Sequence, residues 1–159
     1  MGRPPVGRAV IVRPAGPADG AAWVRCRHRL WPHRTAEELA ETVEAFFGAG
    51  TALVAAVFVA WEADTPVGFV ELSLRAYVPG ARQLPAPFVE GWYVEPAARG
   101  RGVGRALIEA AQQWAHDHGH RQLGSDTALD NVDSLGAHRA LGFREVEAVR
   151  FLIKELIGR

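Results

Sequence analysis

The stretch Glu90–Ala111 reads EGWYVEPAARGRGVGRALIEAA and indicates a strand, a proline turn and a helix in succession. Between the turn and the helix, positions 99–105 hold three glycines and three arginines. Glycine destabilises a helix interior, so glycines concentrated where a helix begins indicate that the backbone approaches another molecule closely. The arginines indicate that this molecule is negatively charged.

The segment Arg99–Gly104 has the pattern R-x-x-G-x-G. It does not match the dinucleotide fingerprint G-x-G-x-x-G, because Arg105 stands where the third glycine is required, and the P-loop pair Lys-Ser/Thr is missing. The first N–H groups of a helix lack intrahelical partners and carry the positive end of the dipole, which favours a pyrophosphate ligand. A tight turn under a solvated arginine patch is the alternative.

Patterns of apolar residues predict the remaining elements. Strands are predicted at 8–14, 51–62, 67–78, 88–94 and 121–126, and two short strands within 143–156. Helices are predicted at 17–31, after Thr35 with Glu38 completing a capping box, after the glycines, and at 131–142. The order β-α-α-β-β-β-α-β-α-β-β predicts an α/β fold: a mixed, mostly antiparallel sheet of six to seven strands flanked by four helices.

Alternation along the strands assigns side chains to faces. In 67–78, Glu71, Ser73, Arg75 and Tyr77 are predicted to face away from Val70 and Leu72. In 88–94, one face is predicted to carry Phe88, Glu90 and Trp92.

Composition limits the function classes. The 159 residues suit one domain, predicted at 8–157 after a flexible tail at 1–7. Eighteen basic and eighteen acidic residues cancel, so we expect neither a nucleic-acid nor a membrane partner. Cys26 is the only cysteine, which rules out an internal disulfide and a cysteine metal cluster, and we expect no metal. Without a long apolar segment, a cytoplasmic location is expected.

The glycine segment, the two helices before the second strand and the ALGF sequence at 140–143 together resemble the GCN5-related N-acetyltransferase (GNAT) superfamily. In that superfamily R/Q-x-x-G-x-G/A holds the pyrophosphate of an acyl-CoA. The resemblance implies acetyl-CoA as co-substrate, bound where the fourth and fifth strands splay apart. It assigns these residues to the co-substrate: Trp92, Tyr93, Val94, Arg99, Gly100, Arg101, Gly102, Val103, Gly104 and Asn131. For Asn131, a helix cap is the alternative role.

A narrower resemblance rests on LWP at 30–32, RAYV at 75–78, SDT at 125–127, DN at 130–131, AHRALGF at 137–143 and EVEAVRF at 145–151. With the glycine segment, these look like the aminoglycoside 6'-N-acetyltransferases of the Ig/Iy type. The resemblance implies acetylation of the 6'-amino group of aminoglycoside antibiotics, hence antibiotic resistance, and a homodimer. Acceptor-binding roles are implied for Trp31, Arg34, Tyr77, Glu90, Asp126 and Glu147.

Three departures from that family concern the acceptor pocket. Arg34 stands where the family has histidine, and Leu152 replaces a tyrosine. The loop around Tyr77 is one residue shorter and lacks an aspartate of the family pattern. These departures predict a different acceptor pocket and, with it, a different preferred aminoglycoside.

The expected chemistry is direct attack by the acceptor amine in a ternary complex. An ammonium must lose a proton before it attacks a thioester, and Glu90 is the expected base, with anchoring of the ammonium as the alternative. Backbone N–H groups near Tyr93 and Val94 are expected to polarise the acetyl carbonyl. The departing thiolate is expected to take its proton from His138 or Tyr93, with simple packing as the alternative for His138.

Two other functions remain open from the sequence. One is an N-acetyltransferase for a polyamine, an amino sugar or a protein N-terminus. The other is an acyl-CoA-binding sensor or assembly subunit, which would keep the glycine segment and have no need of Glu90.

Overall fold

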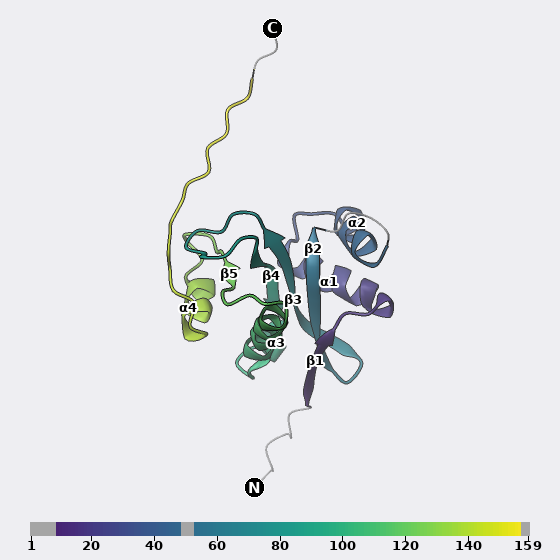
Figure 1. The fold of residues 1–159 in the computed structure, drawn as a ribbon. Helices are drawn as coiled ribbons and strands as arrows, with labels where there is room; N and C mark the ends of the chain where they lie inside the picture. Colours follow the sequence, from purple (N-terminus) through teal and green to yellow (C-terminus); the bar gives the residue numbers. More distant parts are fainter. Residues whose placement is uncertain (1–8, 49–52, 157–159) are drawn as a thin grey trace. The chain divides into compact units, whose positions relative to one another are not determined.

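The computed structural model describes residues 9–48 and 53–156 (Figure 1). Within these residues one sheet has the order β1-β2-β3-β4-β5. Its strands are β1 (Val10–Pro14), β2 (Val54–Glu62), β3 (Thr65–Arg75), β4 (Ala86–Val94) and β5 (Gly124–Ser125). The first four strands are antiparallel and β5 runs parallel to β4, which confirms a mixed, mostly antiparallel sheet.

Four α-helices accompany the sheet in the described residues, as predicted: α1 (Gly20–Leu30), α2 (Ala36–Phe47), α3 (Val103–Asp117) and α4 (Val132–Ala140). Short 3₁₀ turns occur at Pro17–Asp19 and Pro96–Ala98. The predicted capping box of α2 is confirmed. The Glu38 N–H donates to Thr35 Oγ1 over 3.2 Å, and the Thr35 N–H donates to Glu38 Oε2 over 3.0 Å.

The prediction of six to seven strands was wrong, because residues 143–156 form neither helix nor strand and the described sheet has five strands. Alternating apolar residues predicted strands there, but a strand needs a neighbour that satisfies its backbone N–H and C=O groups. In this chain Phe151, Leu152 and Ile153 are each more than 90% exposed. The apolar pattern therefore indicates a preference for strand structure, but among the described residues this segment pairs with no other strand.

The described chain divides into two compact units, the first ending at Asp126 and the second starting at Thr127. The first contains the whole sheet with α1, α2 and α3, and the second contains α4. The single domain at 8–157 stays a prediction. Its first and last residues and the flexible tail predicted at 1–7 lie outside the described residues, as does the predicted start of the second strand at residue 51.

In the first unit, α1 and α2 cover one face of the sheet and α3 covers the other (Figure 1). Trp23 of α1 is fully buried and meets the rings of Phe46 and Phe47 edge-on, at centroid distances of 5.3 and 6.0 Å. On the opposite face, a Cβ at Gly68 of β3 would lie 3.2 Å from Leu107 of α3. Glycine at position 68 therefore lets α3 lie close to the sheet.

A buried ion pair joins α1 to β3. Arg27 and Glu71 are 4% and 2% exposed, and Arg27 Nε lies 3.1 Å from Glu71 Oε2. Trp23 Nε1 donates to the same oxygen over 2.8 Å, and Arg27 Nη1 donates to the Leu39 carbonyl of α2 over 2.8 Å. Burial raises the pKa of Glu71, and the charge of Arg27 opposes that shift. This pair connects α1, α2 and the centre of the sheet.

Replacing Glu71 with glutamine is expected to lower the free energy of unfolding by about 3 kcal/mol, because it leaves the Arg27 charge buried without a counterion. Urea denaturation measures the change. As a control, Arg34→Ala removes the exposed Arg34–Glu38 ion pair of 3.7 Å and is expected to cost less than about 1 kcal/mol. A loss below 1 kcal/mol for Glu71→Gln would show that the buried pair does not support the fold.

Candidate active site

A β-bulge in β4 lies at Glu90. Across β3 and β4, Glu71 pairs with Gly91 while the next residue, Leu72, pairs with Val89, so Glu90 is an extra residue in β4. A bulge bends its strand and re-aims side chains, and bulges are frequent beside active sites. The register of pairing between β3 and β4 therefore shifts at Glu90.

The bulge corrects the predicted face of β4. Glu90 contacts the side chains of Ser73 and Arg75, which lie on the α1 side of β3 with Glu71. Trp92 points the other way, since a Cβ at Gly104 in α3 would lie 3.1 Å from its ring. Phe88, Glu90 and Trp92 therefore do not share one face, because the extra residue shifts the alternation.

The Glu90 carboxylate has three donors from β3. Arg75 Nε donates to Oε1 over 2.8 Å and Arg75 Nη2 to Oε2 over 2.7 Å, while Ser73 Oγ donates to Oε1. Partial burial favours a higher pKa for Glu90, but the hydrogen bonds from Arg75 and Ser73 and the Arg75 charge lower its pKa below the ordinary value. Glu90 is therefore an ionised carboxylate near neutral pH.

Trp31, which follows the last residue of α1, packs against the backbone next to Glu90. A Cβ at Gly91 would lie 2.8 Å from the Trp31 ring, so glycine next to Glu90 makes room for the indole. The Trp31 ring meets Phe69 edge-on at 6.3 Å, and the Arg27 guanidinium lies 5.1 Å from its centroid. The Trp31 ring therefore lies against the residue next to Glu90, and the acceptor roles of both residues stay predictions.

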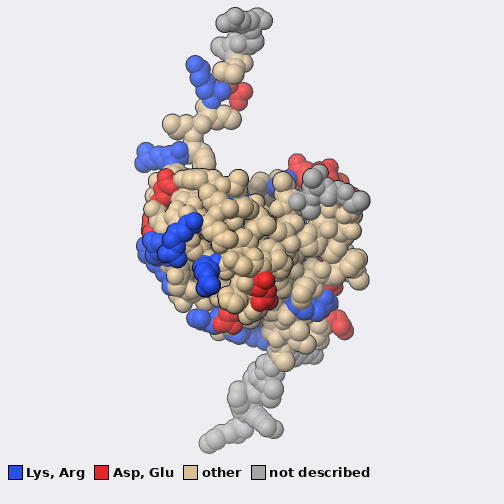
Figure 2. All heavy atoms as spheres, viewed as in Figure 1, with Lys and Arg blue, Asp and Glu red and all other residues tan. Residues whose placement is uncertain are grey.

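Other predicted acceptor residues of the first unit lie at the surface. Asp126 is exposed, and its charge acts on Arg75, which places it near the Glu90 cluster. Tyr77 is 70% exposed, and Arg34 forms an exposed ion pair with Glu38. Figure 2 shows acidic side chains over α2, which carries four glutamates and no lysine or arginine: Glu37, Glu38, Glu41 and Glu44.

The strand β5 pairs with only part of β4. The parallel ladder joins Phe88 to Gly124 and Val89 to Ser125, and in the described residues β5 extends no further. The strand β4 continues to Val94. The backbone of Trp92, Tyr93 and Val94 therefore follows the point where β4 and β5 part, in agreement with the predicted splay.

The predicted glycine loop has the geometry of an anion site. Gly100 and Gly102 have φ values of +72° and +82°, and a Cβ on either would meet no atom within 4 Å. Gly102 caps α3, and the Ala106 N–H donates to the Gly102 carbonyl as the first helical bond. The N–H groups of Val103 and Gly104 precede that bond and lie at the positive end of the helix.

Two arginines of the loop are anchored to the sheet. Arg99 Nε donates to the Val94 carbonyl over 2.9 Å, and its guanidinium lies 5.9 Å from the Tyr93 ring centroid. Arg101 Nη2 lies 2.8 Å from Glu62 Oε1 of β2. These contacts hold the loop against the C-terminal ends of β4 and β2, and Glu62 partly balances the charge of Arg101.

Tyr93 near the end of β4 forms a hydrogen bond with a carboxylate. Its hydroxyl donates to Glu95 Oε2 over 3.1 Å. Burial, followed by the charge of Glu95, raises the pKa of Tyr93. The phenol therefore keeps its proton at neutral pH.

The second unit holds three predicted site residues. Asn131 Oδ1 accepts from the Ser134 N–H over 3.0 Å, so the capping alternative is confirmed. His138 is 8% exposed, and its Nδ1 lies 2.7 Å from the Ser134 carbonyl, which can only accept. The ring therefore carries its proton on Nδ1 when neutral. Glu147 is exposed in the segment without regular structure.

Sequence reasoning assigned no role to three residues of this cluster. Ser73 and Arg75 bind Glu90, and Arg27 lies between Glu71 and Trp31. The signal was present in the alternation of β3, which puts Glu71, Ser73 and Arg75 on one face. What the sequence lacked was the bulge that turns Glu90 to the same face.

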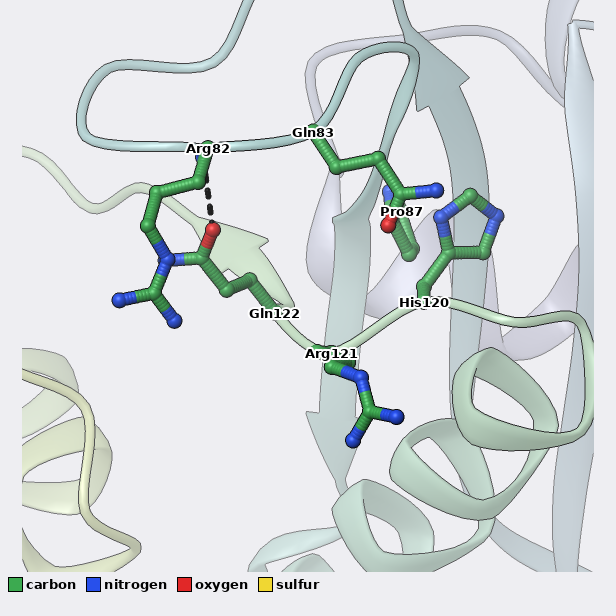
Figure 3. Close-up of a pocket in the computed structure, with 6 residues that line it drawn as sticks. All are labelled: Arg82, Gln83, Pro87, His120, Arg121 and Gln122. Atoms are coloured by element: carbon green, nitrogen blue, oxygen red, sulfur yellow. Dashed lines mark hydrogen bonds between the residues drawn. The ribbon is translucent and has the colours of Figure 1, made fainter.

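A separate pocket lies at the opposite end of β4 (Figure 3). Pro87 at the start of β4 lines it, with Arg82 and Gln83 from the loop before β4 and His120–Gln122 from the segment after α3. The glycine loop follows the other end of the strand, so this pocket is not the predicted pyrophosphate site.

No helix in the described ranges combines the length and apolar character needed to cross a bilayer. Among the same residues, no three histidine, cysteine or acidic side chains are grouped so that they could hold a metal ion.

Comparisons with known proteins find relatives that match most of this chain. The model of the acetyltransferase (GNAT) family matches residues 22–143. An aminoglycoside N(6')-acetyltransferase type 1 from Stenotrophomonas maltophilia is 45% identical over 148 residues, which are 91% of this chain and 92% of the relative. One from Klebsiella aerogenes is 42% identical over 147 residues, with 92% and 97% covered.

Solved structures are similar over nearly the whole chain. AAC(6')-Iy in complex with the bisubstrate analog CoA-S-monomethyl-acetylneamine gives a TM-score of 0.85 at 34% identity, covering 93% of this chain and 99% of that chain. AAC(6')-IG from Acinetobacter haemolyticus gives a TM-score of 0.80 at 35% identity, covering 92% and 99%.

The glycine loop can be tested by Gly102→Val. A branched side chain there would block the approach of the pyrophosphate, and we expect coenzyme A to bind at least about 30-fold more weakly, or ~2 kcal/mol. Calorimetric titration measures the affinity. Gly119→Val is the matched control, because Gly119 has a φ of +83° and equally open surroundings at the other end of α3. Equal affinities for the two variants would refute a pyrophosphate site at this loop.

Proposed function

Because this chain belongs to the GNAT family of acetyltransferases, we propose that it transfers acetyl from acetyl-CoA to the 6'-amino group of aminoglycoside antibiotics, which confers resistance. The observation that carries the proposal is the arrangement of one strand. A carboxylate stands on the bulge of β4, and an anion-binding helix terminus follows the end of the same strand. Similarity to aminoglycoside N(6')-acetyltransferases at 45% identity supports this acceptor over a simple polyamine or amino sugar.

Acetyl-CoA supplies an acetyl group activated as a thioester. The backbone at Gly100 and Gly102 and the first N–H groups of α3 bind its pyrophosphate, as their left-handed geometry and open surroundings allow. Arg99 and Arg101 add positive charge beside the loop. Backbone N–H groups near Tyr93 and Val94 polarise the acetyl carbonyl from the edge of β4 that β5 leaves uncovered.

The acceptor is a polycation and needs carboxylates that face it. Glu90 and Asp126 provide these charges in the first unit, and the glutamates of α2 add a negative field. Trp31 forms an apolar wall beside Glu90. Tyr77 and Arg34 are further acceptor residues of the first unit in this proposal, and Glu147 of the second unit stays a prediction.

The reaction begins with deprotonation of the acceptor ammonium. Glu90 holds the ammonium and takes its proton directly or through a water molecule, after which the amine attacks the thioester. A carboxylate with a lowered pKa is a weak base, which favours the alternative that Glu90 anchors the ammonium. When the C–S bond of the tetrahedral adduct breaks, Tyr93 donates a proton to the departing thiolate and regains one from the nitrogen that becomes the amide. His138 would have to be a charged imidazolium to do so, because its Nδ1 proton is held by Ser134.

We also propose that the protein acts in the cytoplasm as a homodimer. Acetyl-CoA is a cytoplasmic metabolite, and a catalyst that consumes it works in the same compartment. The exposed apolar side chains of Phe151, Leu152 and Ile153 favour burial against a second copy, since contiguous apolar surface is commonly covered in an assembly.

Neomycin B and paromomycin test the acceptor and the regiochemistry, because they differ only in an amine or a hydroxyl at the 6' position. We expect thiol release from acetyl-CoA with neomycin B, and none above background with paromomycin. Proton NMR of the product is expected to place the acetyl group on the 6' nitrogen. Acetylation of both compounds, or a product acetylated at another amine, would contradict the proposed function.

A further inference from the structure

We propose that Arg75 determines acceptor specificity. Its guanidinium forms an ion pair with Glu90, the carboxylate that binds the acceptor ammonium, and only an acceptor with several ammonium groups displaces it. This inference rests on the proposed function and adds how the site distinguishes polycations from simple amines. It concerns residues of the first compact unit alone.

The geometry of the pair is that of a filled cation site. Arg75 meets Glu90 with its Nε and Nη2 at 2.8 and 2.7 Å, so its planar fork engages both carboxylate oxygens. Ser73 donates a further hydrogen bond to Oε1. An amine that approaches Glu90 therefore meets a carboxylate that already has a cation bound.

The pair is also accessible. The Arg75 and Glu90 side chains are 40% and 28% exposed, and ion pairs in contact with water are held weakly. The Arg75 guanidinium lies 3.5 Å from the ring centroid of Phe88, and Asp126 acts on it as a second negative charge. Arg75 can therefore leave Glu90 and remain near Phe88 and Asp126.

The balance of charge explains the selection. Glu90 and Asp126 carry two negative charges and Arg75 one positive charge, so the cluster has a net charge of −1. A monoamine that displaces Arg75 exchanges one cation for another and loses a two-point contact. An acceptor with several ammonium groups can contact Glu90 while a second ammonium interacts with the remaining negative charge, which compensates the loss.

Two acceptors with the same reacting ring test this inference in the full-length protein. Kanamycin A carries several amines, whereas methyl 6-amino-6-deoxy-α-D-glucopyranoside carries the reacting amine alone. In Arg75→Gln, kcat/KM for the monoamine is expected to rise at least about tenfold, because the competing cation is gone. For kanamycin A a smaller rise is expected, because a second ammonium already compensates for the displacement of Arg75, so the preference for kanamycin A over the monoamine falls. KM for acetyl-CoA is expected to be unchanged.

Arg82→Gln is the matched control, since it removes the same charge from a different residue. The backbone N–H of Arg82, which the change keeps, donates to Gln122 Oε1 over 2.7 Å. It is expected to leave the ratio of the two kcat/KM values unchanged. Arg75→Lys keeps the charge but loses the fork, so an intermediate ratio is expected. This variant also provides the test if Arg75→Gln does not fold.

The outcomes separate this inference from the proposed function. A parallel fall of kcat/KM for both acceptors in Arg75→Gln would show that Arg75 only holds Glu90 in position, and would overturn the inference. An unchanged ratio would overturn it as well. If the unmodified protein releases no thiol with kanamycin A, the proposed function fails first, and the inference fails with it.

Discussion

The bulge at Glu90 is the constraint on which the proposed site depends. One extra residue lets Glu90 and Gly91 serve the α1 side of the sheet while Trp92 packs against α3 on the other side. Without it, strict alternation would send Glu90 away from Ser73 and Arg75 or Trp92 away from Gly104. In the proposed site, a single strand therefore presents a carboxylate to the acceptor and, a few residues later, its backbone edge to acetyl-CoA.

The buried Arg27–Glu71 ion pair supports the α1 side of the sheet, where the proposed acceptor site lies. Arg27 contacts Glu71, the Leu39 carbonyl and the Trp31 ring, and so fixes the end of α1 relative to β3. Burying an ion pair gives little net stability, but removing one partner is costly, so the arrangement specifies a position more than it strengthens the fold. The wall formed by Trp31 is thus held by packing and electrostatics together.

Local chemistry made much of this predictable. The glycine loop and the Thr35 capping box depend on residues close in sequence, and both have the predicted geometry. The bulge was not predictable, because alternation in 88–94 looks regular and the extra residue is defined only by pairing with β3. The strands predicted in 143–156 failed for a related reason, since apolar alternation reports a preference and not a partner. The role proposed for Arg75 could not be predicted either, because it depends on Glu90 lying on the same face of the sheet as Arg75.

The central claim is that the Glu90 carboxylate receives the acceptor ammonium. Steady-state kinetics of Glu90→Gln tests it most directly, because the change keeps the shape and removes charge and basicity. The account predicts that kcat/KM for neomycin B falls at least about 100-fold with KM for acetyl-CoA unchanged, whereas Glu109→Gln on the exposed side of α3 has no such effect. A fall in kcat would assign Glu90 as the base, and a rise in KM alone would assign it as the anchor. An unchanged kcat/KM would contradict the account.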